Sequence, residues 1–340
     1  MATTKLKIAL IQLYCKVPLT PIQRDSPRPS SKLDLHATAS LRTPAQTLDA
    51  EGNFAKAESF IRSAASQGAD LAVLPEYHLS SWVEKHSDLL AVARHSAAHL
   101  KRYQDLAKEL SICIVPGTIL EPRDDGDSSG EPKPLANMCY FIGPDGAVQG
   151  SYQKRNLWHP EKGILEASPA PQPHAAFDTP LGRVGLLVCW DIAFPEAMRA
   201  LVADGAKLVV VPSFWLASDD DDEGVPAKTA EETLFLDSVC VARAFENTCA
   251  VAFVNSGGAA SGGCIPKPKP ARDDLGRVYA GVSQVALPRK GPLGRIAHGE
   301  EAMSVVEVDM GFVEEAEELY KAREDMAKRK WVYGASLKGL

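Results

Sequence analysis

Short apolar runs alternate with helical patterns along the first half of the chain. Apolar, β-branched residues predict strands, and apolar residues at helical spacing predict the helices between them. The expected order is a strand over Lys5–Leu13, a helix over about Asn53–Ala65, a strand over Leu71–Pro75, a helix over Ala91–Leu110 and a strand over Ile112–Ile119. This alternation is typical of an α/β fold.

A predicted β-hairpin follows. The segments Asn137–Ile142 and Ala147–Gln153 flank a Gly-Pro-Asp-Gly sequence at 143–146. Proline presets one turn angle and glycine tolerates a positive φ, so these segments are expected to pair antiparallel. The sheet is therefore predicted to be mixed.

The second half of the chain repeats the order of the first. Its clearest trace is GADLAVLPE at Gly68–Glu76 against GAKLVVVPS at Gly205–Ser213, where a helix ends at glycine and a buried strand stops near proline. The other expected elements are strands over Val184–Cys189, Leu208–Pro212 and Ala250–Val254 and helices over about Pro195–Asp204 and Ala230–Glu246.

Length alone allows two domains, but no linker separates the two halves. We therefore predict one internally duplicated α-β-β-α sandwich over residues 5–310, with two mixed sheets face to face and helices outside. Residues 311–340 form a predicted helical tail for surface or subunit contacts. Pro18–Thr47, rich in Pro and Ser, is either a disordered insertion or a lid and contact loop.

Composition narrows the class of partner. The 340 residues include 37 Lys and Arg against 44 Asp and Glu, a net charge of −7, which disfavours nucleic acid or an anionic membrane as the main partner. The expected partner is a small molecule. No long apolar stretch predicts a membrane span, and seven cysteines without a C-x-x-C pattern favour a reducing, cytoplasmic setting.

Three reactive side chains fall at the ends of predicted strands: Glu76, Lys154 and Cys189. Taken singly, each has an ordinary interpretation as a helix cap, a solvated lysine and a small buried hydrophobe. Open α/β sheets bind ligands at the carboxyl ends of their strands, so the three are expected to meet in one cleft. A carboxylate base and a cation are what a cysteine needs to act as a nucleophile.

The surrounding motifs resemble those of the nitrilase superfamily, the carbon–nitrogen hydrolases. The matching segments are L-P-E-Y at Leu74–Tyr77, Y-x-K-x-x-L at Tyr152–Leu157 and G-L-L-V-C-W-D-I-x-F-P-E at Gly185–Glu196. The resemblance implies an α-β-β-α sandwich, a Glu76–Lys154–Cys189 triad and homo-oligomers, either dimers or tetramers. Such chemistry requires no metal ion and no organic cofactor.

Glu161 is the candidate for a second glutamate that often supports the lysine in this superfamily, with a plain surface acid as the alternative. Asp191, two residues after the predicted nucleophile, favours an amide substrate over a nitrile in this family. Ala193 stands where many Nit-type members carry arginine. We therefore expect an amidase acting on a small carboxamide, with an N-carbamoyl amino-acid amidohydrolase or a nitrilase as alternatives.

Aromatic residues near the strand ends are candidates for the wall of an acyl pocket, although such residues also serve as core. The candidate substrate-binding residues are Trp158, Trp190, Phe214 and Trp215, with Trp82 and Phe194 also near strand ends. The Trp190 backbone N–H is a candidate oxyanion donor. Two alternatives come from other classes: a catalytically silent binding or scaffold protein, and a thiol redox protein. The redox alternative is disfavoured because the sequence has no evident resolving cysteine.

Overall fold

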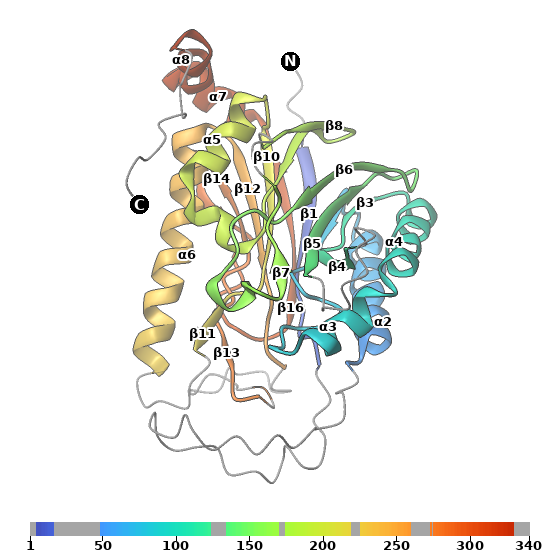
Figure 1. Ribbon diagram of the computed structural model, residues 1–340. Helices are drawn as coiled ribbons and strands as arrows, with labels where there is room; N and C mark the ends of the chain where they lie inside the picture. Colours follow the sequence, from blue (N-terminus) through green and yellow to red (C-terminus); the bar gives the residue numbers. More distant parts are fainter. Residues whose placement is uncertain are drawn as a thin grey trace.

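The protein forms four layers, with two sheets packed face to face and helices outside each sheet (Figure 1). This arrangement confirms the predicted α-β-β-α sandwich. The computed structural model describes residues 5–16, 48–123, 134–169, 174–218, 225–259, 273 and 275–329. The segment 18–47 and Cys264 lie outside these residues, so the predictions for them are not addressed.

The first sheet has the strand order β16-β1-β2-β3-β5-β4, and β6 and β7 also pair with β5. Its strands are β1 (Lys5–Gln12), β2 (Leu71–Val73), β3 (Cys113–Val115), β4 (Thr118–Pro122), β5 (Leu135–Ile142), β6 (Val148–Gln153), β7 (Leu165–Glu166) and β16 (Ala302–Asp309). β5 and β6 pair antiparallel, as the hairpin prediction required. The helices of this half are α2 (Ala50–Ser66), α3 (His86–Ala93) and α4 (Ser96–Leu110), and a single turn of 3-10 helix, η1, spans His159–Glu161.

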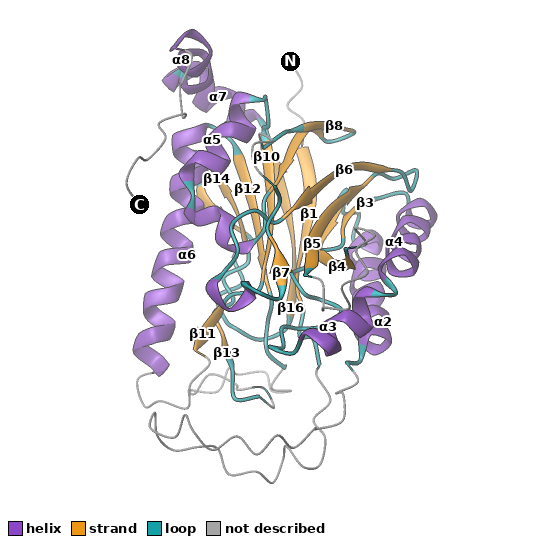
Figure 2. Ribbon diagram, in the orientation of Figure 1, coloured by secondary structure: helices purple, strands orange, loops and turns teal. Residues whose placement is uncertain are grey.

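The second sheet has the order β15-β14-β12-β10-β9-β8, and β11 and β13 form a separate pair. The strands are β8 (Phe177–Thr179), β9 (Gly182–Leu186), β10 (Leu208–Ser213), β11 (Leu216–Ser218), β12 (Ala250–Asn255), β13 (Val278–Tyr279), β14 (Gln284–Leu287) and β15 (Gly291–Leu293). The helices are η2 (Cys189–Ala193), α5 (Pro195–Ala203), α6 (Val225–Asn247), α7 (Gly311–Tyr320) and α8 (Ala322–Arg329). Figure 2 shows α5 and α6 together on the outer side of this sheet.

The two halves repeat the same pairing. Strands β1, β2 and β3 are parallel neighbours in one sheet, and β9, β10 and β12 are parallel neighbours in the other. In each half an antiparallel strand follows, β5 beside β3 and β14 beside β12. The repeated sequence therefore places the carboxyl ends of β2 and β10 at equivalent positions in the two sheets.

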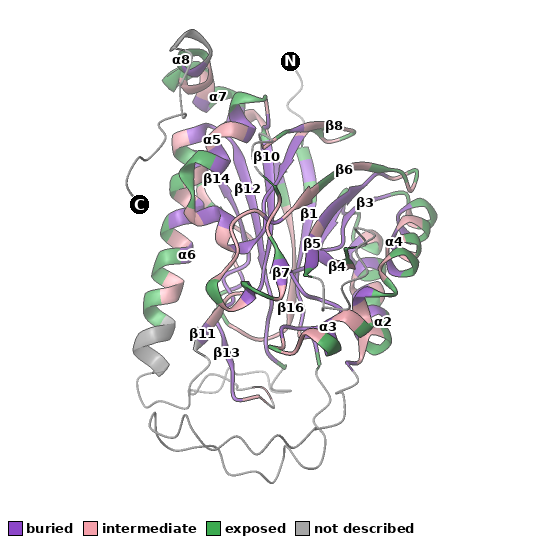
Figure 3. Cartoon of the chain, in the orientation of Figure 1, coloured by how far each residue is buried: buried purple, intermediate pink, exposed green. Residues whose placement is uncertain are grey.

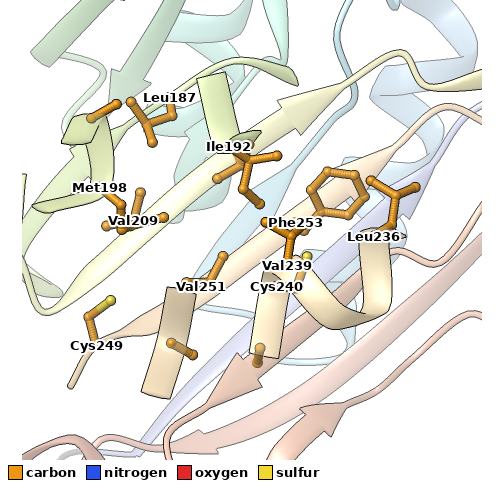
Figure 4. Close-up of a cluster of buried hydrophobic side chains, with 14 of the residues drawn as sticks. Leu187, Ile192, Met198, Val209, Leu236, Val239, Cys240, Cys249, Val251 and Phe253 are labelled. Atoms are coloured by element: carbon orange, nitrogen blue, oxygen red, sulfur yellow. The ribbon is translucent and has the colours of Figure 1, made fainter. Parts of the chain in front are cut away.

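Three apolar layers hold the sandwich together. Side chains such as Leu10, Val73, Val210 and Val254 fill the space between the sheets. A second layer joins α5 and α6 to their sheet (Figure 4), and a third joins α2 and α4 to theirs. Because helices or a second sheet cover both faces of the central strands, every residue of β10 and β12 is buried, as in Figure 3.

Two predicted elements of the first half are each divided in two. The predicted helix over 91–110 is α3 followed by α4, since α3 packs Leu89 near the end of the sheet whereas α4 packs Tyr103 and Leu106 against its face. The predicted strand over 112–119 is β3 followed by β4. Gly117 turns the chain between them with φ +59°, and a Cβ there would lie 1.8 Å from the carbonyl oxygen of Pro75.

One other expected boundary is wrong. The strand predicted to end at Cys189 ends at Leu186, where its register with β10 stops, and Cys189 begins η2 instead. The C-terminal pattern forms two helices, α7 and α8. Lys321 between them has a left-handed backbone, which ends α7.

Candidate active site

Glu76, Lys154 and Cys189 meet at one end of the sandwich, as the strand-end argument predicted. The Lys154 Nζ donates a hydrogen bond to Oε1 of Glu76 at 2.8 Å. The Cys189 thiol donates a long hydrogen bond to the Phe214 carbonyl oxygen at 3.9 Å and lies close enough to Glu76 to alter the pKa of that carboxyl group. Glu76 and Lys154 are completely buried, and Cys189 is only 6% exposed. The polypeptide thus brings a thiol, a carboxylate and an ammonium group together in one cluster away from bulk water.

Glu161 belongs to the same cluster. Its Oε1 accepts a hydrogen bond from the Lys154 Nζ at 2.7 Å, and its Oε2 accepts one from the Trp158 backbone N–H at 2.7 Å. The Tyr77 hydroxyl also donates to this carboxylate. Glu161 is completely buried, so the alternative of a surface acid is wrong.

Two donors to the Glu76 carboxylate escaped the sequence analysis. The Asn137 side chain donates to Oε1 of Glu76 at 2.8 Å and to the Tyr77 hydroxyl at 3.2 Å, and the Phe214 backbone N–H donates to Oε2 of Glu76 at 3.0 Å. Asn137 stands out in the sequence as a polar residue within the apolar strand β5, which is a usable signal. The hydrogen bond from Phe214 to Glu76 joins the ends of β2 and β10, and no local sequence pattern predicts it.

The backbone around Cys189 is strained and firmly held. Cys189 has φ +49°, a left-handed conformation that costs a residue other than glycine on the order of 1–3 kcal/mol. The buried Asp191 carboxylate accepts hydrogen bonds from the Val188 backbone N–H (3.0 Å), the Tyr152 hydroxyl (3.0 Å) and the Asn156 backbone N–H (2.9 Å). Asp191 therefore ties the turn that carries Cys189 to the segment that carries Lys154.

Burial and mutual contact shift the ionisation of the cluster. Burial raises the pKa of Glu76 to about 7, although the Lys154 ammonium opposes this change. Burial acts in the opposite sense on Lys154, but contacts with Glu76, Cys189 and Glu161 outweigh it and raise the lysine pKa, so Lys154 stays charged. Burial and the negative Glu76 raise the pKa of the Cys189 thiol, which therefore rests protonated at neutral pH.

A cavity of about 810 Å³ opens onto the Cys189 side chain. All four predicted substrate-binding residues, Trp158, Trp190, Phe214 and Trp215, line it, and so do residues that the sequence analysis missed: Leu157, His159, Lys162, Leu216, Ala217, Glu231, Glu232 and Phe235. Trp82 and Phe194 do not line this cavity. Trp82 is buried against Tyr77, with ring centroids 5.3 Å apart, and Phe194 meets the edge of Trp190.

In the part of the chain that the structure describes, no group of three or more His, Cys, Asp or Glu side chains is arranged to hold a metal ion. No helix in these ranges has both the length and the apolar character needed to cross a bilayer.

Comparison with known proteins places this chain in a family. Residues 38–318 match the carbon-nitrogen hydrolase family. Among curated relatives, a nitrilase from Pyrococcus abyssi is 27% identical over 79% of this chain and 87% of its own length. The human omega-amidase NIT2 is 34% identical over 47% of this chain, and the match spans 57% of that enzyme's length.

Solved structures show the same fold. An amidase from Nesterenkonia sp. AN1 superposes with a TM-score of 0.64 and 24% identity, covering 96% of this chain and 97% of its own. Saccharomyces cerevisiae Nit3, a nitrilase-superfamily member, superposes with a TM-score of 0.66 and 21% identity, covering 92% and 93% of the two chains. At these identities the superpositions establish the architecture alone.

A duplicated α-β-β-α sandwich with a buried thiol–carboxylate–ammonium cluster beside a cavity defines a hydrolase class. The family match covers most of the chain, so the protein belongs to the carbon-nitrogen hydrolase family of the nitrilase superfamily, and it is a carbon–nitrogen hydrolase with amidase-type relatives.

Proposed function

We propose that the protein hydrolyses the C–N bond of a small carboxamide and releases ammonia through an acyl-thioester on Cys189. The observation that carries this proposal is the buried cluster beside the cavity, in which the Lys154 ammonium is hydrogen-bonded to the Glu76 carboxylate and the Cys189 thiol lies near enough to both to interact electrostatically. Among the superposed structures, the Nesterenkonia amidase is described with an acetamide moiety on its active-site cysteine, which supports the same role for Cys189.

The first half-reaction forms the thioester. Glu76, with a pKa of about 7, takes the thiol proton as the Cys189 sulfur attacks the amide carbon. The carbonyl π electrons move to oxygen, and the Lys154 ammonium and the Trp190 backbone N–H stabilise the resulting oxyanion. Trp190 is the second residue of η2, where a helical N–H has no acceptor within its own helix. The C–N bond then breaks, and Glu76 returns the proton to the departing ammonia.

The second half-reaction consumes water. Glu76 removes a proton from a water molecule, and the resulting hydroxide attacks the thioester carbon. The C–S bond then breaks to release a carboxylic acid, and the departing Cys189 thiolate takes the proton back from Glu76, which restores the thiol and the carboxylate. Glu161 keeps the Lys154 ammonium in place through the 2.7 Å ion pair and stays in contact with it throughout the cycle. The net reaction is amide plus water to carboxylic acid plus ammonia.

Ammonia detection combined with intact-protein mass spectrometry tests the proposal. The protein is mixed with small amides, N-carbamoyl amino acids and nitriles. We expect ammonia from one or more amides together with an acyl adduct on Cys189. Carbon dioxide released together with ammonia from an N-carbamoyl amino acid would identify the carbamoyl alternative. The similarity of the chain to an Arabidopsis thaliana N-carbamoylputrescine amidase is the reason to include these compounds. The absence of product and adduct from every compound would overturn the proposal.

The rate of Cys189 alkylation by iodoacetamide is expected to follow the ionisation of Glu76. Because the thiol rests protonated and Glu76 removes its proton, the rate should rise with pH around an apparent pKa near 7, below the usual range of a free thiol. The Glu76→Gln variant should lose this rise and react about 10²- to 10⁴-fold more slowly at pH 8. A wild-type profile that rises only above pH 8.5 would contradict the base role of Glu76.

We further propose a homo-oligomer and a cytoplasmic, reducing setting. The ring of Phe245 on α6 packs at an angle against that of Tyr320 on α7, with centroids 5.1 Å apart, and both residues are more than 40% exposed, as is Leu319, the residue before Tyr320. An exposed apolar surface of this kind is typical of a contact between subunits. The six cysteines within the described ranges are all free thiols, as in proteins of a reducing compartment.

A further inference from the structure

A row of aromatic rings leads away from the nucleophile. The Trp190 ring, next in sequence to Cys189, lies 5.5 Å from the Trp215 ring, and the Trp215 ring stacks on the Phe235 ring, also at 5.5 Å and with 29° between the planes. All three residues line the cavity that opens onto Cys189. The row therefore forms one wall of the cavity, contributed by η2, the loop after β10, and α6.

This wall is held in position. Oε2 of Glu232 accepts a hydrogen bond from Nε1 of Trp215 at 2.7 Å, which fixes the plane of the indole. Glu232 and Phe235 are three residues apart on α6 and so lie on the same side of the helix. Trp215 is thus held between a hydrogen bond at its edge and a ring at its face. A rigid aromatic surface of this kind discriminates among ligands by shape.

Part of this aromatic wall is exposed to the cavity or to solvent. Phe235 is 37% exposed, although an aromatic ring of its size usually buries most of its area. On the segment after β6, Leu157 and Trp158 add further apolar surface to the cavity. The volume of about 810 Å³ lies within the range of roughly 300–1,000 Å³ typical of pockets for drug-sized ligands, far more than acetamide fills.

We infer that the preferred substrate is a primary carboxamide whose acyl group carries an aromatic ring, and that Trp215 and Phe235 select it by stacking. This inference rests on the proposed function. Because ammonia is the leaving group, the acyl group is the only substrate part large enough to occupy the cavity. The ring lies against the Trp215–Phe235 wall while the amide carbon sits at the Cys189 sulfur.

The charged residues of the cavity agree with an uncharged acyl group. Glu231 and Glu232 come from α6, and Lys162 and His159 come from the segment after β6. Among the described residues that line the cavity, both acidic side chains and a lysine are therefore present. A substrate whose acyl group ended in a carboxylate would bring that negative charge near Glu231 and Glu232 of α6. Glu232 also already accepts the hydrogen bond from the Trp215 indole.

The test compares kcat/KM for matched amides. We expect 3-phenylpropanamide to exceed propanamide by at least about 10-fold, because one hydrophobic methylene alone is worth roughly 10-fold or more in a fitted pocket. In Phe235→Ala, the ratio of the two kcat/KM values should fall about threefold to tenfold, the range expected for one aromatic contact. Leu234→Ala is the matched control, since Leu234 is the preceding residue on α6, is 68% exposed and does not line the cavity, so its ratio should stay at the wild-type value.

Three results would separate the possibilities. If kcat/KM for propanamide equals that for 3-phenylpropanamide, the aromatic-acyl inference is wrong while the proposed function stands. The same holds if Phe235→Ala keeps the wild-type ratio of the two kcat/KM values. A higher kcat/KM for succinamic acid or 4-aminobutanamide than for 3-phenylpropanamide would also overturn it, in favour of a charged acyl group. If no amide yields ammonia or an adduct on Cys189, the proposed function itself fails.

Discussion

Replacement of Cys189 by alanine is expected to lower kcat/KM for the best amide by about 10⁴-fold or more and to abolish the acyl adduct. The reason is chemical: alanine cannot form the thioester, and the cluster then holds a base without a nucleophile. The side chain lies at the carboxylate of Glu76 and at the mouth of the cavity, so the substitution removes the attacking atom while leaving the pocket walls in place. Initial rates of ammonia release and intact mass together measure the effect.

The matched control is Cys240→Ala. Cys240 is another completely buried cysteine, but it lies in the apolar layer between α6 and its sheet (Figure 4). This variant should retain the acyl adduct and wild-type kcat/KM, with at most a loss of stability from the smaller side chain. If Cys189→Ala still forms an adduct, or if Cys240→Ala loses it, Cys189 is not the nucleophile.

Replacement of Lys154 by methionine is expected to impair both activity and stability. The Nζ of Lys154 lies 2.8 Å from Glu76 and 2.7 Å from Glu161, and all three side chains are at most 1% exposed. Removing the cation leaves two carboxylates in a buried site, which costs about 3–5 kcal/mol in the free energy of unfolding. The oxyanion loses a cationic donor as well, so kcat should fall by about 10²-fold or more.

The stability loss should depend on pH. The folded-state pKa of Glu76 lies at about 7, above its unfolded value near 4.5, so protonation favours the folded state and this contribution is lost as pH rises through 7. Without Lys154 the carboxylates repel each other fully, and the loss should be larger at pH 8.5 than at pH 5.5. Urea unfolding at the two values measures it. Lys101→Met, which removes an exposed lysine paired with Asp105, should change stability little at either pH. If Lys154→Met lowers the free energy of unfolding equally at both pH values, the stability contribution of Lys154 does not depend on the ionisation of Glu76.

Sequence reasoning singled out Glu76, Lys154 and Cys189 because each stands at or near the end of a predicted strand. Strand periodicity identifies where a run ends, and parallel strands in an open sheet present their carboxyl ends at one edge. The sequence pattern predicted Cys189 as the last residue of its strand, whereas β9 ends at Leu186 and Cys189 has a left-handed backbone. That difference lies in hydrogen-bond register, which apolar patterning does not encode.

Other site residues depend on contacts between segments far apart in the chain. Asn137 on β5 reaches Glu76 because β5 crosses the first sheet beside β3, and Phe235 reaches the cavity because α6 packs over the second sheet. A polar residue inside an apolar strand marks Asn137 as unusual, but the sequence does not name its partner. For Phe235, the helical pattern separates a buried face from an exposed one and says nothing about which exposed residues face a ligand.

The sequence by itself determined the duplicated α/β order, the mixed sheets and the positions of Glu76, Lys154 and Cys189, because strand and helix periods are local and reactive groups interrupt them visibly. Tertiary structure alone decided that Glu161 is buried beside Lys154, that Asp191 joins the nucleophile turn to the lysine segment, and that Trp215 and Phe235 form one wall. These features arise where the two sheets and their covering layers meet. Burial, pKa and stacking depend on neighbours brought together by packing, and a one-dimensional pattern specifies which faces are covered but not by which residues.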